Sequence, residues 1–340
     1  MKTFFDEENR LERLTELGDV LVRLTKVVNW EQFRPLLEEI YYVEDNRLGG
    51  RKPYDRVKMF KTLILQGLYN LSDDSIEYQI NDRLSFQRFL GLELGDRVPD
   101  AKTIWLFREQ LKKSGREKEL FNLYTRELKE RCIVTKAGSI VDATFIERSE
   151  QKANNRRNPD NRYKRDDISD ENKNKDRQYD KDARFTKKHG KWHFGYKNHV
   201  KADVESKIIT DYAVTDATTH DNTQVAEMLD EDDNIVFMDA GYRSSEKEKI
   251  WKEKAPKADI RISKANLSGK PLSLEEKTRD RPNRSIRMKV EHIFGHMQKS
   301  MGGKFVRCVG LARTRVLVMI KNLAYNISRS LSISNLTTQT

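Results

Sequence analysis

Apolar residues recur at helical spacing in the first third of the chain, which predicts that residues 1 to about 132 are helical. Val57, Phe60, Ile64 and Leu68 follow one another every three or four positions, as on one face of an α-helix. The alternation of apolar and polar residues that is typical of a half-buried strand is not evident before residue 133. The sequence therefore predicts an all-α N-terminal domain.

A second helix of this domain is predicted to begin at Ser72. Two aspartates follow this serine, where the helix dipole favours negative charge, and a serine side chain is a good N-cap. Ile76, Ile80 and Leu84 continue the same apolar face. We expect one continuous helix through these positions.

A third helix is predicted over residues 101–112, ending near Ser114 and Gly115. Short helices joined by tight turns permit a helix-turn-helix arrangement, in which this helix would be the recognition helix. Trp105 and Arg108 are then candidate DNA contacts. The alternative is a helical bundle in which Trp105 and Phe107 fill the core.

The periodicity changes at Gly138, where strand patterns begin. Three strands are predicted first, and helices and strands then alternate, which indicates an α/β fold with a mixed, partly antiparallel sheet. The strands are predicted over 139–147, 192–204, 207–215, 234–239 and 258–263, and the helices from Asp221 and over 244–254, 284–299 and 311–330. The predicted domains are 1–132 and 133–335.

Composition favours a polyanionic partner. The 340 residues carry a net charge of +11 and a pI near 9.4, and the length suffices for two domains. Cys132 and Cys308 are far apart in sequence, which argues against structural zinc and a disulfide framework and fits a reducing compartment. No signal peptide or membrane-spanning run is evident, so we expect a cytoplasmic protein with no membrane partner.

Residues 148–190 are predicted to form a basic insertion between the first two strands. Over 151–190 there are thirteen Lys or Arg and eight Asp or Glu, and few aliphatic residues. Such a segment buries too little apolar surface to order itself, so disorder is expected in the absence of a ligand. It is either a solvated loop or a loop that contacts nucleic acid beside Asp142.

Two aspartates lie at the ends of short strand-like runs of apolar residues. Asp142 follows Ile140 and Val141, and Asp239 follows the run from Ile235 to Met238. Burying an unpaired carboxylate is costly, so an acid in such a position needs a partner. Each aspartate taken alone fits a strand-end cap or turn residue better than a metal ligand.

Glu291 is the only acidic residue between Arg281 and Arg315, a stretch that holds nine Lys or Arg. By itself it fits an i,i+4 partner of Arg287 on a solvated helix. Together with the two aspartates it predicts a site for Mg²⁺ or Mn²⁺, which prefer oxygen ligands and often share substrate phosphates. Two such ions suffice for in-line phosphoryl transfer, so the pattern indicates phosphodiester chemistry on nucleic acid.

Three motifs carry a resemblance to a known family: Ile-Val-Asp142-Ala-Thr, Val-Phe-Met-Asp239-Ala-Gly-Tyr, and Arg287 four residues before Glu291. They resemble the acidic motifs of DDE transposases encoded by bacterial insertion sequences, particularly the insertion sequence five family. The similarity covers most of the chain, including Met59 to Leu111, and extends to His193-Phe-Gly-Tyr-Lys197, His199 and Thr219-His-Asp221.

The resemblance implies a ribonuclease-H-like catalytic domain, with Asp142, Asp239 and Glu291 as catalytic metal ligands for two Mg²⁺ or Mn²⁺ ions. The acids are 97 and 52 residues apart, as in that family. Two positions depart from its pattern. Arg284 stands where a tyrosine is usual, and Gln298 stands where a lysine is usual, with Lys299 next.

Several basic residues are predicted to contact DNA. Arginine matches the geometry of phosphate, so Arg284, Arg287, Lys289 and Lys299 are candidate phosphate contacts, and solvated helix charge is the alternative. His193 and His220 lack other ligands at short spacing and are expected to be structural. His220, next to Asp221, is also a possible substrate contact.

The sequence thus predicts a transposase that cleaves DNA at the ends of its element and joins the 3′ hydroxyl to target DNA. Its partners would be double-stranded DNA, from the terminal repeats and the target, and further copies of the chain in a homo-oligomer. Two alternatives stay open. One is a catalytically impaired DNA-binding derivative, and the other is a ribonuclease-H-like nuclease that cuts without joining.

Overall fold

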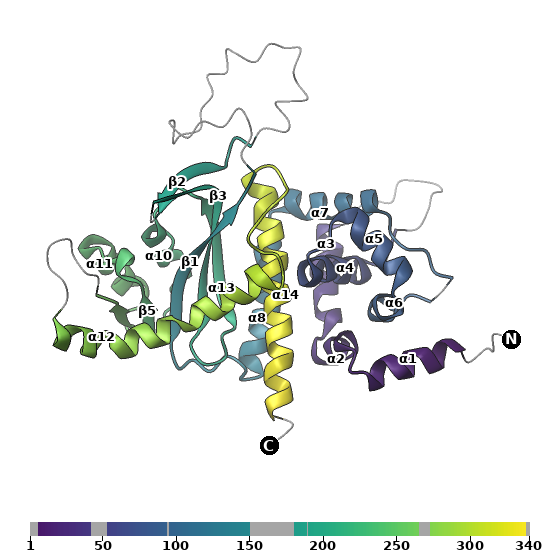
Figure 1. Ribbon diagram of the computed structural model, residues 1–340, viewed down its shortest axis with the longest axis horizontal. Helices are drawn as coiled ribbons and strands as arrows, with labels where there is room; N and C mark the ends of the chain where they lie inside the picture. The colour runs from purple at the N-terminus through teal and green to yellow at the C-terminus, as the bar shows by residue number, and fades with distance from the viewer. Residues whose placement is uncertain are drawn as a thin grey trace, which may run out of the picture. The chain divides into compact units, whose positions relative to one another are not determined.

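The computed structural model describes residues 6–41, 53–93, 95–149, 180–188, 190–264 and 273–337, and the chain folds into two compact units (Figure 1). One unit contains residues 1–124 and 319–340, and the other contains 125–318. The helices α8 (Glu117–Glu130) and α14 (Leu311–Thr337) each contribute to both units. The division into two functional domains with a boundary at residue 132 stays a prediction.

The first unit is helical, as the apolar spacing predicts. Its helices before α8 are α1 (Asp6–Glu16), α2 (Val20–Val27), η1 (Trp30–Phe33), α3 (Arg34–Ile40), α4 (Arg56–Tyr69), α5 (Asp73–Asp82), α6 (Leu84–Leu90) and α7 (Ala101–Ser114). The most buried is α4, because its apolar residues are not confined to one face. A Cβ on Gly67 of α4 would lie 2.9 Å from Ile320 of α14, so the glycine permits close packing of these two helices.

The helix predicted from Ser72 is correct in its start and wrong in its length. The Ser72 hydroxyl accepts a hydrogen bond from Ser75 N, as an N-cap should. Arg83 is extended and ends α5, so Leu84 begins α6 and does not continue the helix. The side chain of Gln87 donates to the carbonyl oxygens of Ile80 and Asn81, which satisfies the end of α5.

The second unit contains a mixed sheet of β1 (Ser139–Glu147), β2 (Arg184–Lys188), β3 (Lys191–Asp203), β4 (Ile209–Asp216), β5 (Ile235–Met238) and β6 (Asp259–Ile262). The strand β3 pairs antiparallel with β1 on one edge and with β2 and β4 in turn on the other. The strands β1, β5 and β6 are parallel. This is the mixed, ribonuclease-H-like sheet that the sequence predicts.

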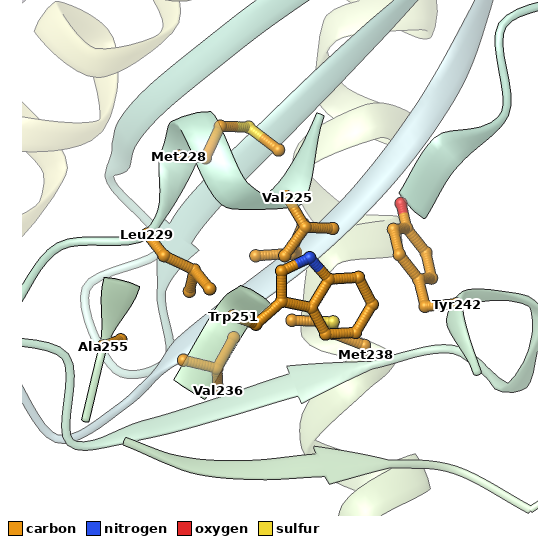
Figure 2. Packing of buried hydrophobic residues seen from close by; sticks show 9 residues of the cluster. Val225, Met228, Leu229, Val236, Met238, Tyr242, Trp251 and Ala255 are labelled. Atoms are coloured by element: carbon orange, nitrogen blue, oxygen red, sulfur yellow. The ribbon is translucent and has the colours of Figure 1, made fainter. Parts of the chain in front are cut away.

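Six helical elements among the described residues connect and cover these strands. They are η4 (Asp221–Thr223), α10 (Val225–Met228), η5 (Ala240–Tyr242), α11 (Ser245–Lys254) and the pair α12 (Leu274–Arg287) and α13 (Lys289–Lys299). Residues of α10, η5 and α11 pack with β1 and β5 in one buried cluster, which has Trp251 at its centre (Figure 2). On β1, Val141 belongs to this cluster and Asp142 points to the opposite face, as strand alternation requires.

Three sequence predictions of secondary structure are wrong in this unit. The helix from Asp221 is broken into η4 and α10, because Thr223 donates its hydroxyl to the His220 carbonyl in a tight turn. The helix predicted over 284–299 is two helices that meet at Met288, and the first begins at Leu274 in a polar stretch without apolar periodicity. Residues 184–188, predicted as part of a disordered insertion, form strand β2. Most of that insertion, 150–179, lies outside the described residues.

No helix among the described residues combines the length and apolar character needed to span a membrane. Both cysteines, Cys132 and Cys308, are free.

Candidate active site

The two aspartates of the predicted site lie side by side in the sheet. Val141 of β1 pairs with Met238 of β5 in parallel register. The residues that follow these two, Asp142 and Asp239, are therefore neighbours. The strand β5 ends there, whereas β1 continues to Glu147. The carboxyl ends of parallel strands are the usual place for a ligand in such folds. The two strands that carry the aspartates are therefore neighbours in the sheet.

Asp142 is nearly buried, with 13% of its side chain exposed. Its Oδ1 accepts a hydrogen bond from the N–H of Ala143 at 2.8 Å, and Oδ2 accepts one from Nη1 of Arg287 at 3.2 Å. Burial raises the pKa of Asp142 to about 6, and the carboxylates of Asp239 and Glu291 add to the rise, whereas the Ala143 N–H and Arg287 oppose it. Asp142 thus carries a charge that its surroundings stabilise poorly.

Asp239 is half-buried and caps the 3₁₀ turn η5. Its Oδ1 accepts a hydrogen bond from the N–H of Ala240 at 2.7 Å. The strand-end cap that was the alternative interpretation of this residue is therefore present. The cap occupies Oδ1 of Asp239. Among the described residues, Oδ2 accepts no hydrogen bond.

Glu291 is exposed in the first turn of α13, a helix that packs on β1. It is near enough to affect the pKa of Asp142, so the three acids belong to one region of the molecule. Within the ranges that the structure describes, however, no three His, Cys, Asp or Glu side chains are arranged to hold a metal ion together. The acids converge, but Glu291 does not complete a coordination set with the two aspartates.

Arg287 is the cation that faces the aspartates in this structure. The helix break at Met288 separates Arg287 from Glu291, and the guanidinium pairs with Asp142 instead. Its Nε is buried and has no hydrogen-bond partner among the described residues. Arg287 therefore does not form the expected i,i+4 pair with Glu291. Its contact with Asp142 offsets part of the buried negative charge.

The other predicted DNA contacts of this unit have different surroundings. Arg284 donates from Nε to Asp280 at 2.7 Å and from Nη2 to the carbonyl oxygen of Lys264 at 2.6 Å. Lys289 is 3.3 Å from Glu205, and Lys299 is exposed at the end of α13. These side chains are not gathered around Asp142, and their contacts with DNA stay a prediction.

The histidines also differ in their surroundings. The Nδ1 of His193 is 3.1 Å from the Glu147 carboxylate, and its ring stacks on Phe145. His220 caps η4, and its Nδ1 accepts a hydrogen bond from the N–H of Asn222. Because η4 packs against η5, His220 lies in the turn next to the one that Asp239 caps.

Sequence reasoning missed two contacts near the site. Gln298, regarded as a departure from the family pattern, donates from Nε2 to the hydroxyl of Thr144 at 2.9 Å, two residues along β1 from Asp142. Lys197 pairs with Asp221 at 2.8 Å and donates to the carbonyl oxygen of Thr219. The sequence did indicate that Thr144 lies on the same face of the strand as Asp142, because residues i and i+2 of a strand share a face.

In the first unit, Trp105 and Arg108 lie in different environments on α7. Trp105 is 41% exposed, so it is not a core residue, whereas Phe107 is buried. Arg108 donates to both carboxylate oxygens of Asp73, at 2.8 and 2.7 Å, and also to Gln66. The guanidinium therefore joins α7 to α5 and α4.

The oxygen-rich donor set at the end of β5 suits a hard divalent cation. Carboxylate oxygens are the ligands that Mg²⁺ and Mn²⁺ prefer, and two neighbouring acids, one nearly buried and one half-buried, need a positive partner. Asp142 and Asp239 fit such an ion, and Glu291 lies in the same region of the molecule. Carboxylates that hold such an ion suit metal-assisted phosphoryl transfer.

Comparison with protein families agrees with this class of site. Residues 135–327 match the transposase DDE domain, and residues 9–110 match a transposase domain, DUF772. The chain belongs to the transposase DDE domain family and is a DDE-type DNA transposase of an insertion sequence. Membership implies a protein that acts on DNA and uses a divalent metal ion. The narrower placement in the insertion sequence five family stays a prediction.

Without metal, the contribution of Asp142 to stability is expected to fall as the pH rises from about 4 to about 6. The folded protein holds the Asp142 proton up to about pH 6, whereas an unfolded aspartate releases it near pH 4. The folded state therefore binds more protons in this window, and raising the pH disfavours it by about 2–3 kcal/mol. Urea unfolding in EDTA at several pH values measures this. A stability that rises across the window in wild type and Asp142→Asn alike would contradict the assignment.

Proposed function

We propose that Asp142, Asp239 and Glu291 hold two divalent ions, Mg²⁺ or Mn²⁺, and that this centre cleaves DNA at the ends of the element and joins the 3′ hydroxyl to target DNA. The observation that carries the proposal is the pair of neighbouring aspartates, of which Asp142 is buried with a raised pKa. Bound ions would supply the charge that stabilises the attacking and leaving oxygens of the phosphate.

The residues around the acids have separate roles in this proposal. Arg287 neutralises Asp142 before metal and DNA bind, and it is then released to contact a phosphate, which its planar guanidinium fits. Gln298 positions α13 on β1 through Thr144, and thereby holds the helix that carries Glu291. Arg284, Lys289 and Lys299 extend the basic surface of α12 and α13 for the DNA backbone, and His220 contacts substrate from the turn beside Asp239.

The test is incubation of the full chain with DNA that carries the element's own ends. With Mg²⁺ we expect strand cleavage and joined products, and with EDTA neither. Cleavage without joining would favour a nuclease, and salt-sensitive binding without cleavage would favour an impaired DNA-binding derivative. Cleavage that proceeds equally in EDTA would contradict the metal-dependent mechanism.

The helical unit is proposed to recognise the element ends through α7, with two copies of the chain acting together on two ends. We expect exposed side chains to contact the DNA, and not side chains that are paired with other residues of the unit. Trp105→Ala should weaken DNA binding about tenfold or more, since loss of an aromatic contact costs on the order of 1–3 kcal/mol, and should leave unfolding unchanged.

Arg108→Ala is the matched comparison on the same helix. Because Arg108 pairs with Asp73, this change is expected to lower the stability of the helical unit, by about 1–3 kcal/mol. Fluorescence anisotropy of labelled end DNA and urea unfolding separate the two effects. A Trp105→Ala protein that binds like the wild type would contradict the role of α7.

A further inference from the structure

A buried hydroxyl group without a partner lies beside the acidic site. Tyr242 is 2% exposed, and its Oη has no hydrogen-bond partner among the described residues. A buried tyrosine hydroxyl usually has one, because an unsatisfied polar group costs free energy when it is removed from water. The metal-ligand assignments do not account for this residue, although it closes the Asp239-Ala-Gly-Tyr motif.

The backbone fixes Tyr242 relative to Asp239. Both belong to the η5 turn, in which the N–H of Tyr242 donates to the carbonyl oxygen of Asp239 at 3.1 Å. The ring packs in the buried cluster with Val141 and Trp251, and the hydroxyl oxygen is at the end of the ring that points out of the cluster (Figure 2). A rigid ring thus presents one polar atom at a defined place.

The groups that face this hydroxyl are acidic. Burial raises the pKa of Tyr242 well above its ordinary value, and the carboxylates of Asp142, Asp221 and Asp239 raise it further, whereas Arg287 lowers it. Two of the three are the proposed metal ligands, and the third, Asp221, is held by Lys197. The carboxylates are near enough to act electrostatically, but none is hydrogen-bonded to the hydroxyl.

We propose that Tyr242 is a positioning residue of the metal site, whose hydroxyl oxygen accepts a hydrogen bond from a water molecule carried by a divalent ion at Asp142 and Asp239. The inference rests on the proposed function. Mg²⁺ in proteins usually keeps several of its waters, and these polarised waters are strong donors. The water would fill the gap between the hydroxyl and the carboxylates, and would itself be held in one orientation.

Loss of this contact should weaken metal binding without disturbing the metal-free protein. Groups that hydrogen-bond to the ligands of a metal contribute about 10–100-fold to its affinity. The hydroxyl has no partner in the part of the chain that the structure describes, so its removal breaks no hydrogen bond there, and a phenylalanine ring fills the same space.

The experiment is thermal unfolding of the full chain, without DNA, over a titration with Mn²⁺ and another with Mg²⁺. For Tyr242→Phe we expect a metal-free Tm equal to that of the wild type or slightly higher. The metal concentration that gives half of the stabilisation should rise about tenfold or more. A midpoint equal to that of the wild type would overturn the inference, as would a clearly lower metal-free Tm, which would show that the hydroxyl already has a partner.

Tyr41→Phe is the matched control. Tyr41 is equally buried, but its hydroxyl donates to the carbonyl oxygen of Phe107 at 2.8 Å in the helical unit. This change should lower the metal-free Tm and leave the metal midpoint unchanged, the reverse of the pattern for Tyr242→Phe.

Asp142→Asn distinguishes failure of the inference from failure of the proposed function. It should abolish metal-dependent stabilisation. If stabilisation persists in Asp142→Asn, or if the wild type shows none, the proposed metal site is wrong and the inference fails with it. If only Tyr242→Phe behaves like the wild type, the inference alone is overturned.

Discussion

Replacing Asp180 with alanine is expected to lower the free energy of unfolding by about 3–5 kcal/mol, because it removes one partner of a buried ion pair. Asp180 is fully buried and lies 3.1 Å from Nη1 of Arg148, whose side chain is 7% exposed. Its carboxylate also accepts hydrogen bonds from the Tyr196 hydroxyl at 2.7 Å and from the N–H groups of Ala183 and Gly310. Alanine would leave the guanidinium of Arg148 buried without this carboxylate.

Asp182→Ala is the control for this change. Asp182 is exposed and accepts a hydrogen bond from the N–H of Leu311 at 2.8 Å, so its loss should cost only about 1 kcal/mol. Urea unfolding of both variants by linear extrapolation measures the difference. Equal effects would contradict the assignment of Asp180 as the buried anchor.

Arg148 and Asp180 flank residues 149–179, so this ion pair ties together the two ends of the basic insertion.

Asp142→Asn is expected to produce a protein that is more stable without metal and almost inactive. At pH 7 the wild type holds an ionised Asp142 in a site that raises its pKa to about 6, at a cost of about 2–3 kcal/mol that asparagine avoids. Loss of the pair with Arg287 reduces this gain, so a net rise of about 1–2 kcal/mol is expected. Strand cleavage should fall about 10³-fold or more, since metal stabilisation of the transition state is worth several kcal/mol.

Two measurements test the two halves of this prediction. Urea unfolding in EDTA should show the gain in stability at pH 7 and its disappearance below about pH 4, where the wild-type carboxyl becomes protonated in both states. Cleavage of end DNA with Mg²⁺ gives the activity. Asp232→Asn makes the same charge change on an exposed residue of the same unit and should alter neither. An Asp142→Asn protein that cleaves DNA like the wild type would remove Asp142 from the site.

Apolar patterns predicted β1, β3 and β5 well because each of these strands contains buried apolar residues, whereas β2, with one buried residue, was missed. The predicted strand 139–147 coincides with β1, and 234–239 differs from β5 by one residue at each end. Asp239 was therefore placed correctly at the end of its strand, whereas Asp142 lies within β1, which continues to Glu147. The parallel register of β1 and β5 brings Asp142 beside Asp239, and it could not be predicted without the fold.

The remainder of the site could not be read from sequence, because it depends on where helices break and which side chains pair. Nothing in the sequence marked the break at Met288, which frees Arg287 for Asp142 in place of Glu291. The start of α12 was missed because residues 274–283 lack an apolar face. Tyr242 was part of a quoted motif, but only packing reveals that its hydroxyl is buried without a partner.

The central claim is that Asp142 and Asp239 hold a divalent cation together, and anomalous diffraction from crystals of the protein grown with Mn²⁺ tests it most directly. The account predicts an anomalous peak within about 2.0–2.3 Å of a carboxylate oxygen of each aspartate, with Arg287 withdrawn from Asp142. Mn²⁺ bound elsewhere on the chain, with Arg287 still paired to Asp142 and no peak between the two aspartates, would contradict it.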